Sequence, residues 1–258
     1  MINAKDKLGT EDFKEILCDF HSRLADRYTD ELIKIISTAN DLSANGQKAL
    51  SLLNSWDRTP IAESTATTIF EEFYAAFIKN SLSDELGEDL FKELSSVIIH
   101  NKFEYLWRDS SSSWIDYVNT QHFETFDEIV LLSFKETVEW LEKNVDKDPA
   151  NWKWGNIHQL NLKHFLGSVK ILNKIFGFNK GTFSVDGSFH TVNPMAYSFH
   201  NPDSVVYGTS QRHVFNMANL TESYVAIPTG TSGIPASKYY CNQIEMFLNN
   251  DFRKRSLA

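Results

Sequence analysis

Long apolar runs are missing from this chain of 258 residues. A membrane-spanning helix needs about 18 or more consecutive apolar residues, and no stretch of the sequence approaches that length. The first thirty residues also carry too many charged side chains for a secretory signal peptide. We therefore expect no membrane span, and we expect any export signal to lie outside this chain.

Clusters of basic residues are also scarce. The chain has 34 acidic and 25 basic side chains, which gives a net charge of -9. Binding to nucleic acid needs lysines and arginines gathered against phosphates. Here the basic residues are scattered, apart from Arg253, Lys254 and Arg255, which we expect to cap a terminal helix or to extend into solvent. The composition therefore argues against a nucleic-acid partner.

Cysteine is rare, with only Cys18 and Cys241 and no Cys-x-x-Cys pattern. A disulfide would require the two residues to be close in space, which the sequence does not decide. We favour two free, buried thiols, because unpaired cysteine is among the most buried residue types.

Patterns that bind metal ions are absent as well. If the segment holding His158 and His164 is extended, the two imidazoles lie about 20 Å apart at ~3.3 Å per residue. Zinc holds its ligands about 2 Å from one centre, and no cysteine or carboxylate stands nearby at metal spacing. We therefore expect no metal and no cofactor, and we assign both histidines structural hydrogen-bonding roles.

The first part of the sequence is mainly helical in pattern. Apolar residues recur every three or four positions over residues 13–36, which predicts one long helix with Thr10 as its N-cap. The same spacing predicts shorter helices near residues 49–56, 69–77 and 90–98. Thr125 and Glu128 form a capping-box pattern before a further helix, which should end ahead of Pro149.

The composition of the sequence changes after residue 150, where Gly, Pro and Asn become frequent and apolar runs become shorter. Residues 204–207, 213–217 and 223–227 are predicted strands, and a last helix is predicted over about residues 238–249. We expect an α+β fold: a helical region at residues 1–150 and a β-rich carboxy-terminal region of the same domain at residues 151–258.

Short motifs run through the whole chain in a fixed order. Those in the helical part and those in the last third are, in chain order, Asp19, Ala25, Trp56 with Asp57, Phe70, Trp114, Thr120, Glu124, Trp152, Trp154 with Gly155, His158, His164, Thr191, Asn193, Arg212, Gly230, Ser232 and Gly233. Their order and spacing resemble the carboxy-terminal part of the β subunit of penicillin acylases, which are N-terminal-nucleophile hydrolases. No single motif is specific, and the resemblance rests on their order over nearly the whole chain.

The resemblance implies a four-layer αββα sandwich and hydrolysis of linear amide (N-acyl) bonds. The family nucleophile is a serine that begins a long β chain, and its own α-amino group acts as the base. This chain opens with Met1, Ile2 and Asn3. We therefore expect the nucleophile to lie elsewhere and this chain to hold no catalytic residue.

The resemblance also implies partners and a location. The partners are the α subunit and the amino-terminal part of the β subunit, together with an N-acyl small-molecule substrate such as a β-lactam or an acylated homoserine lactone. The location is periplasmic or secreted.

Residues 230–233 are rich in glycine, which predicts a loop with an unusual backbone conformation in which Gly230 and Gly233 allow positive φ angles. The Gly-x-Ser-x-Gly elbow of α/β hydrolases is incomplete, because Gly233 follows Ser232 directly. We interpret Ser232 as a turn residue that binds backbone.

Two further polar candidates lie in the β-rich region. Arg212 is able to clamp a substrate carboxylate or to hold acids and carbonyls of its own chain, and we favour the internal role. Asn193 is interpreted as a turn residue whose side chain binds nearby backbone.

Four tryptophans are expected to anchor the core: Trp56, Trp114, Trp152 and Trp154. The alternative is that they line an acyl pocket.

The chain departs from the family pattern at several positions. Ser237 begins the tail motif, but Tyr239 and Asn242 stand where the family has His and Asp. Ser188 and Cys18 replace an Asp and a Gln. The lost carboxylates imply lost internal ion pairs.

Three functional hypotheses follow. The leading one is the carboxy-terminal part of a penicillin acylase-like hydrolase, and the alternative is a stand-alone, non-catalytic binding or assembly protein. An independent hydrolase that uses Ser232 with His158 or His164 is the weakest of the three.

Overall fold

The computed structural model describes residues 6–94, 99–118, 120–199 and 204–255. Among the described helices, none combines the length and apolar character that crossing a bilayer requires. The α-helices are α1 (Thr10–Leu17), α2 (Arg23–Ile36), α3 (Ala44–Asn54), α4 (Thr65–Leu86), α5 (Glu88–Leu94), α6 (Lys102–Arg108), α7 (Phe126–Asn144), α8 (Trp154–Ile157), α9 (Lys170–Phe176) and α10 (Ile244–Leu248).

The described strands all follow residue 158 and form three small antiparallel sheets. In the first, β1 pairs with β2, and in the second, β3 pairs with β4. In the third, β6 lies between β5 and β7. The strands are β1 (Gln159–Asn161), β2 (Thr182–Ser184), β3 (Met195–Ala196), β4 (Tyr207–Gly208), β5 (Arg212–Val214), β6 (Tyr224–Ala226) and β7 (Arg253–Lys254). Helices together with small sheets confirm the α+β class, while the boundary at residue 150 stays a prediction.

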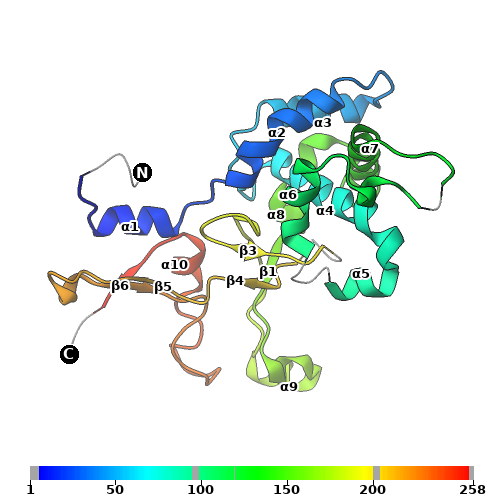
Figure 1. Ribbon diagram of the computed structural model, residues 1–258. Coiled ribbons are helices and arrows are strands. Elements are labelled where there is room, and N and C mark those ends of the chain that lie inside the picture. Colours follow the sequence, from blue (N-terminus) through cyan, green and yellow to red (C-terminus); the bar gives the residue numbers. More distant parts are fainter. Residues whose placement is uncertain (1–5, 95–98, 119, 200–203, 256–258) are drawn as a thin grey trace.

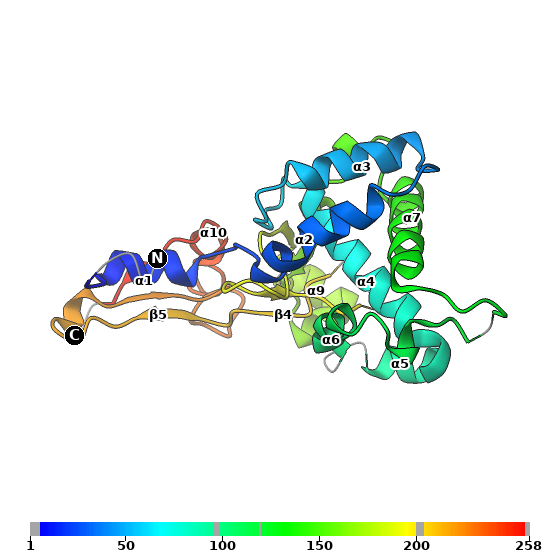
Figure 2. The ribbon, with the colours of Figure 1, turned by 45° about the horizontal axis from the view of Figure 1, so that its top comes forward.

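The molecule is elongated, with a helical body at one end and a narrower extension at the other (Figures 1 and 2). Helices α2 to α8 make up the body. The extension holds α1, α10, β5 and β6, and both chain ends lie there.

Helix α4 forms the centre of the helical body and packs against α3 and α7. It is buried nearly all round because apolar side chains occupy most of its faces. Phe77 of α4 lies edge-on to Phe103 of α6 at 5.4 Å, and Phe103 stacks on Trp107 at 5.0 Å. This core also includes Trp152 and Tyr197, so the segment after residue 150 is anchored in the helical body.

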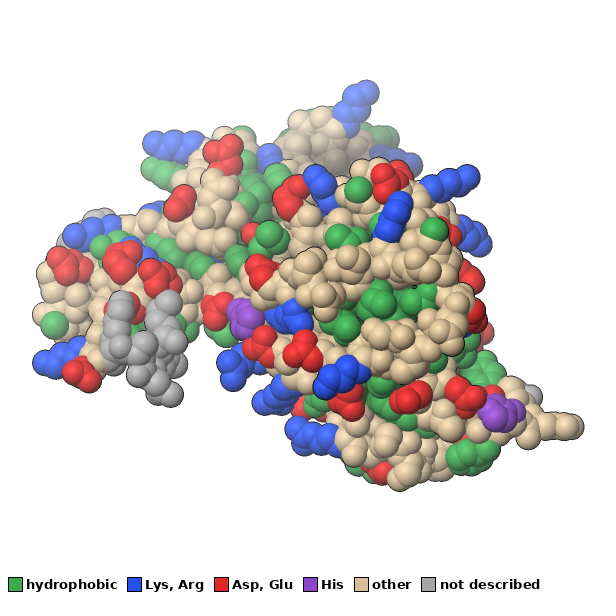
Figure 3. All heavy atoms as spheres, turned by 90° about the horizontal axis from the view of Figure 1, so that it is seen from above, with side chains coloured by type: hydrophobic (Ala, Val, Ile, Leu, Met, Phe, Trp, Pro, Cys, Tyr) green, Lys and Arg blue, Asp and Glu red, His purple; other side chains and the backbone are tan. Residues whose placement is uncertain are grey.

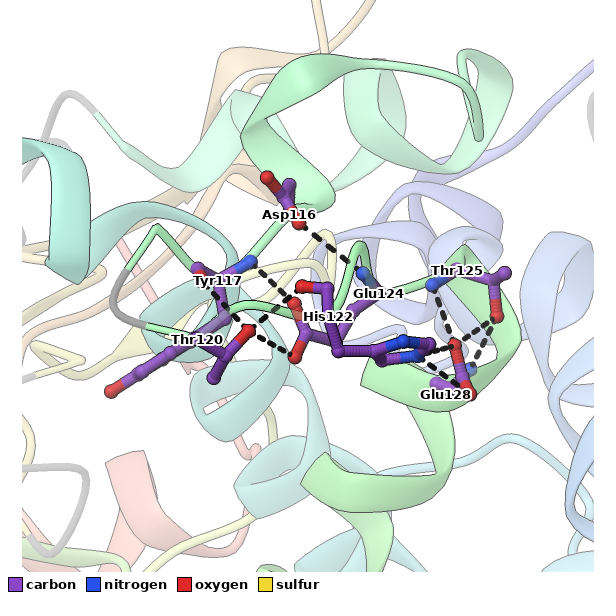
Figure 4. Close-up of polar contacts among 7 residues, drawn as sticks. All are labelled: Asp116, Tyr117, Thr120, His122, Glu124, Thr125 and Glu128. Atoms are coloured by element: carbon purple, nitrogen blue, oxygen red, sulfur yellow. Dashed lines mark hydrogen bonds and ion pairs between the residues drawn. The ribbon is translucent and has the colours of Figure 1, made fainter.

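The predicted capping box at the start of α7 is confirmed (Figure 4). The backbone N–H of Thr125 donates to Glu128 Oε2 at 2.8 Å, and the N–H of Glu128 donates to Thr125 Oγ1 at 3.4 Å. The helix ends at Asn144, ahead of Pro149 as predicted.

The single long helix predicted over residues 13–36 is wrong, because the chain breaks between α1 and α2. The N–H of His21 donates to the Asp19 carboxylate at 2.8 Å, and the N–H of Ala25 donates to Ser22 Oγ at 3.2 Å. Ser22 thereby becomes the N-cap of α2. Short polar side chains take up backbone N–H groups that a continuous helix would have bonded, and the apolar spacing gave no sign of this.

Other predicted helices differ at their ends. Gly9 rather than Thr10 is the N-cap of α1, and the Gly9 N–H donates to Asp12 Oδ2 at 2.7 Å. The helix predicted over residues 90–98 corresponds to α5, and Val97 and Ile98 lie outside the described residues.

The elements predicted near the carboxyl end are shorter than expected. The strand predicted over residues 204–207 overlaps β4 only at Tyr207, the one over 213–217 overlaps β5 at two residues, and the one over 223–227 contracts to β6. The last helix contracts to α10. The chain before α10 is held in turns by backbone hydrogen bonds, including one from Gln243 N–H to Thr229 O at 2.8 Å. These bonds take the place of a first helical turn.

Three of the four expected tryptophan anchors are buried: Trp56, Trp152 and Trp154. The expectation for Trp114 is wrong, because its side chain is 38% exposed. The short helix that holds it (Ser113–Ile115) turns Ile115 inward instead.

Replacing Thr125 with Ala should lower the free energy of unfolding by about 1 kcal/mol, because the start of α7 loses its N-cap acceptor. Chemical denaturation followed by circular dichroism measures the change. Thr125→Ser keeps the hydroxyl and should remain close to wild type. Equal losses in the two variants would show that the hydroxyl does not stabilise α7.

Candidate functional site

The most developed polar cluster lies where the chain after residue 150 packs into the helical body. Trp154 N–H donates to Ser64 O at 3.1 Å, and Gly155 N–H donates to Ala62 O at 2.8 Å. The Trp154 indole N–H donates to Gly187 O at 2.9 Å. We call this junction, formed by residues 152–158 and 184–199 against α4, the seam.

Glu71 of α4 and Tyr197 form the centre of the seam, and both are fully buried. The Tyr197 hydroxyl donates to Glu71 Oε2 at 2.5 Å. Burial raises the pKa of Glu71 to about 7, although hydrogen bonds from Tyr197 and Ser188 oppose the shift. Burial, together with the nearby Glu71, also raises the pKa of Tyr197 well above 10, so Tyr197 remains the donor.

Aromatic rings enclose this pair. His158 caps α8, is fully buried and stacks on Trp154 with ring centroids 4.2 Å apart. Tyr197 lies edge-on to both rings, at 5.9 Å from Trp154 and 6.0 Å from His158. Dry surroundings of this kind explain why the Glu71 carboxyl keeps its proton to nearly neutral pH.

A second buried cluster centres on Arg212 of β5, whose side chain is 2% exposed. One guanidinium nitrogen donates to Phe247 O at 2.9 Å and another to Asn193 Oδ1 at 3.2 Å. The guanidinium also lies over the Phe247 ring at 4.1 Å. Arg212 therefore holds a carbonyl, an amide and a ring of its own chain, and no described carboxylate lies within ion-pair distance.

Asn193 differs from its predicted role. Its side chain is buried and binds other side chains rather than nearby backbone: Oδ1 also accepts from Thr209 Oγ1 at 3.2 Å, and Nδ2 donates to Asn250 Oδ1 at 3.2 Å. The turn interpretation is wrong, because these partners come from β5, from the segment between β4 and β5, and from the segment after α10, which the local sequence does not indicate.

A cavity of about 50 Å³ adjoins this cluster and is lined by Phe20, Asp186, Asn193 and Arg212, among others. Ligand pockets for drug-sized molecules are usually at least about 300 Å³. This space therefore suits water molecules rather than an N-acyl substrate.

Cys18 and Cys241 are both free thiols and are half-buried rather than fully buried. The Cys18 thiol donates to Asn250 O at 3.7 Å. Burial raises the pKa of Cys18, with Arg212 opposing the shift. Burial lowers the pKa of Arg212.

His158 and His164 lie in different surroundings, and the segment between them is not one extended strand. His164 stacks on Phe178 at 4.7 Å, and its Nδ1 accepts from Leu166 N–H at 3.1 Å. Within the described residues, no three Cys, His or acidic side chains gather as metal ligands.

In the loop over residues 229–243, the glycines have a different structural reason from the one predicted. Neither Gly230 nor Gly233 has a left-handed φ, so the positive-φ prediction is wrong. Gly230 is required by close approach, because a Cβ there would lie 2.0 Å from Tyr239 O. Ser232 Oγ accepts from Ile234 N–H at 3.1 Å, which is a turn contact, and Ser237 Oγ accepts from Tyr239 N–H at 3.2 Å.

The loop before α7 brings together two of the motif residues, Thr120 and Glu124 (Figure 4). Glu124 accepts from Tyr117 N–H at 2.9 Å and from Thr120 Oγ1 at 2.8 Å. The Glu124 N–H donates to Asp116 Oδ1 at 3.2 Å. The backbone hydrogen bond from Tyr117 is the main cause that lowers the pKa of Glu124. These contacts join residues of the loop to one another.

Glu71 and Tyr197 were not singled out from the sequence. A usable signal was present, since Glu71 lies on the same helical face as the apolar side chains of Tyr74, Ala75 and Ile78. An acidic residue at such a position has to be buried with a partner. Nothing near Tyr197 in the sequence identified it as that partner.

Replacing Glu71 with Gln should remove a pH dependence of stability. The folded-state pKa of about 7 lies above the ordinary value of 4.5, so the folded protein binds this proton more tightly than the unfolded chain. The stabilisation is complete below pH 4.5 and is lost as the pH rises through 7. The loss amounts to about 3 kcal/mol. Urea denaturation at pH 5.5 and pH 8 should give a larger difference in wild type than in Glu71→Gln.

The matched control is Glu63→Gln, since the Glu63 side chain is 74% exposed. This variant should retain the wild-type pH dependence. If Glu71→Gln and wild type change equally with pH, Glu71 does not titrate in this range.

Replacing Gly230 with Ala should lower the free energy of unfolding by about 1–3 kcal/mol, because the new methyl group overlaps the Tyr239 carbonyl. Gly233→Ala is the control, because a Cβ at that position would have nothing within 4 Å and its φ is ordinary. Denaturation midpoints compare the two variants. A Gly230→Ala midpoint equal to that of Gly233→Ala would contradict the close approach.

Comparison with known proteins agrees with these observations. The family description for penicillin amidase matches residues 1–258. Acyl-homoserine lactone acylase QuiP of Pseudomonas syringae pv. tomato is 25% identical over 210 residues, which cover 78% of this chain and 25% of that protein. The acylase of the same name from Pseudomonas fluorescens is 22% identical over 216 residues, with 81% and 25% covered.

Among solved structures, the thermostable penicillin G acylase from Alcaligenes faecalis has the same fold over this region. The TM-score is 0.56 at 13% identity, with 99% of this chain and 48% of that chain covered. The chain thus spans about a quarter of the length of the curated relatives it matches. With the family match extending over all 258 residues, the chain belongs to the penicillin amidase family.

Proposed function

We propose that this chain is the carboxy-terminal part of an enzyme that hydrolyses linear N-acyl amides, and that it serves there as scaffold and pocket wall. The observation that carries the proposal is the match of the whole chain to the family, combined with its span of only a quarter of the acylase relatives. The nucleophilic serine and the oxyanion donors belong, in this proposal, to the part of the enzyme outside this chain.

The contacts of the candidate nucleophiles support a structural role. Ser232 and Ser237 both accept hydrogen bonds from backbone N–H groups two residues further on. Neither is bonded to His158 or His164 within the described residues. Burial raises the pKa of Cys18, and the neutral thiol that results is a poor nucleophile.

The chemistry proposed for the whole enzyme is acyl transfer to an N-terminal serine. Its hydroxyl oxygen attacks the amide carbon, its α-amino group accepts the hydroxyl proton, and hydrogen-bond donors stabilise the oxyanion. The C–N bond then breaks, and the amine leaves with the proton that the α-amino group had accepted, so that an acyl ester of the serine remains. Water then releases the acyl group. The relatives are named as acylases of acyl-homoserine lactones, so we propose N-acylated amines of this class as substrates.

The architecture proposed for the whole enzyme is the four-layer sandwich of N-terminal-nucleophile hydrolases. Helices α2 to α7 would form outer parts, and the small sheets would extend sheets completed by the α subunit and by the amino-terminal part of the β subunit. The short strands support this, because sheets of two and three strands bury little on their own. By the same resemblance, we propose a periplasmic or secreted location.

The purified chain should not hydrolyse phenylacetyl or long-chain acyl amides above the rate in buffer, because the proposed nucleophile lies outside it. A chromogenic acyl-nitroanilide and an acyl-homoserine lactone are suitable substrates, and an intact penicillin G acylase is the positive control. Turnover by the chain would contradict the scaffold role, and loss of that turnover in Ser232→Ala would identify the serine responsible.

A second experiment tests the link to the rest of the enzyme. The chain is tagged and purified from its native host, and the polypeptides that accompany it are identified. An associated polypeptide that begins with serine and restores amide hydrolysis is the expected result. A monodisperse chain that purifies alone would favour a stand-alone binding protein.

A further inference from the structure

Helix α9 lies on a projecting part of the molecule, beyond β1 and away from the helical body (Figure 1). We define the α9 tip as residues 163–180, which connect β1 to β2. No residue of α9 is buried. A helix with no buried face gains little stability from packing against its own protein.

Large apolar side chains cover this tip. Phe165 is 89% exposed, Ile171 is 72% exposed and Ile175 is 65% exposed. Ile171 and Ile175 are one helical turn apart and therefore share a face. Leu166, Val169 and Phe176 are also exposed. A gathering of this kind on one short segment marks an interaction site.

Polar contacts within the tip contribute to holding its shape. Asn179 Oδ1 accepts from His164 N–H at 2.9 Å, and Asn179 Nδ2 donates to Gly167 O at 3.1 Å. The N–H of Asn179 donates to Asn173 Oδ1 at 2.8 Å. Asn179 therefore organises the tip from within, together with the contact of Phe176 on the buried Phe178 at 5.7 Å. Phe165, Ile171 and Ile175 are mostly exposed and contribute little packing to the tip.

The charge of the tip is opposite to that of the chain. Residues 149–185 contain no Asp or Glu, whereas the tip holds Lys163, Lys170, Lys174 and Lys180, in a chain of net charge -9. On the face seen in Figure 3, by contrast, acidic and basic side chains are interspersed. The tip therefore combines apolar side chains with charges of one sign.

We propose that the α9 tip docks on an anionic lipid surface, with Phe165, Ile171 and Ile175 entering the headgroup region and the lysines meeting lipid phosphates. Apolar groups beside lysines are what interfacial binding requires. A second copy of this chain fits less well, because a symmetric pair would bring lysines against lysines. A narrow projection also offers a protein partner little flat area, whereas lipid conforms to its shape.

Co-sedimentation with vesicles tests the proposal without any assay of amide hydrolysis. The purified protein is mixed with vesicles of phosphatidylcholine alone, or of phosphatidylcholine with phosphatidylglycerol. We expect binding to the anionic vesicles that weakens as salt is added, and far weaker binding to the neutral ones. Lys170→Glu with Lys174→Glu should weaken the binding by at least about 25-fold, at about fivefold for each lysine lost.

The apolar part of the tip is tested by Phe165→Glu with Ile171→Glu, which should abolish vesicle binding. Phe123→Glu is the matched control, since Phe123 is 69% exposed in another loop and its replacement should leave binding unchanged. All the variants should keep the wild-type circular dichroism, because the altered side chains are exposed.

Three outcomes would overturn the proposal. One is no binding to either vesicle, and another is equal loss of binding in Phe123→Glu. The third is self-association in sedimentation velocity that the Phe165 and Ile171 changes abolish, which would assign the tip to a second copy.

Discussion

The structure depends on the buried contact between α4 and the chain that follows residue 150. Trp154 and Tyr197 lie in the same core as the helices, and Tyr197 donates to a carboxyl group that α4 places in dry surroundings. A buried carboxyl without this donor would lose an interaction that partly offsets its desolvation. The β-rich segment is therefore attached to the helical body through a buried hydrogen bond that needs both the Tyr197 hydroxyl and the Glu71 carboxyl.

Arg212 likewise joins distant segments through buried polar contacts, in the narrower part of the molecule. Its guanidinium binds both Asn193, which belongs to the seam, and Phe247 of α10. Because a buried cation needs acceptors from several directions, one side chain fixes three segments that are distant in sequence. Both buried clusters thus hold distant segments of this chain in place, as the proposed scaffold role requires.

Much of the fold follows from local rules that the sequence displays. The capping box of Thr125 and Glu128, the stop before Pro149 and the α+β order were predictable because they depend on neighbouring residues. The break at Ser22, the reason for Gly230 and the partners of Asn193 were not, since each depends on contacts between distant segments or on a choice between competing local bonds. The family could be inferred from the order of the motifs, but Glu71 at the centre of the seam could not be paired with Tyr197, because 126 positions separate them.

The central claim is that the seam makes the helical body and the β-rich segment one cooperative unit. Native-state hydrogen exchange tests it most directly, with the amides of α4 compared to those of β5 and β6 in wild type and in Tyr197→Phe. The account predicts similar opening free energies for both sets in wild type and a parallel decrease in the variant. Protection that falls in β5 and β6 while α4 keeps its wild-type value, or that changes in neither, would contradict it.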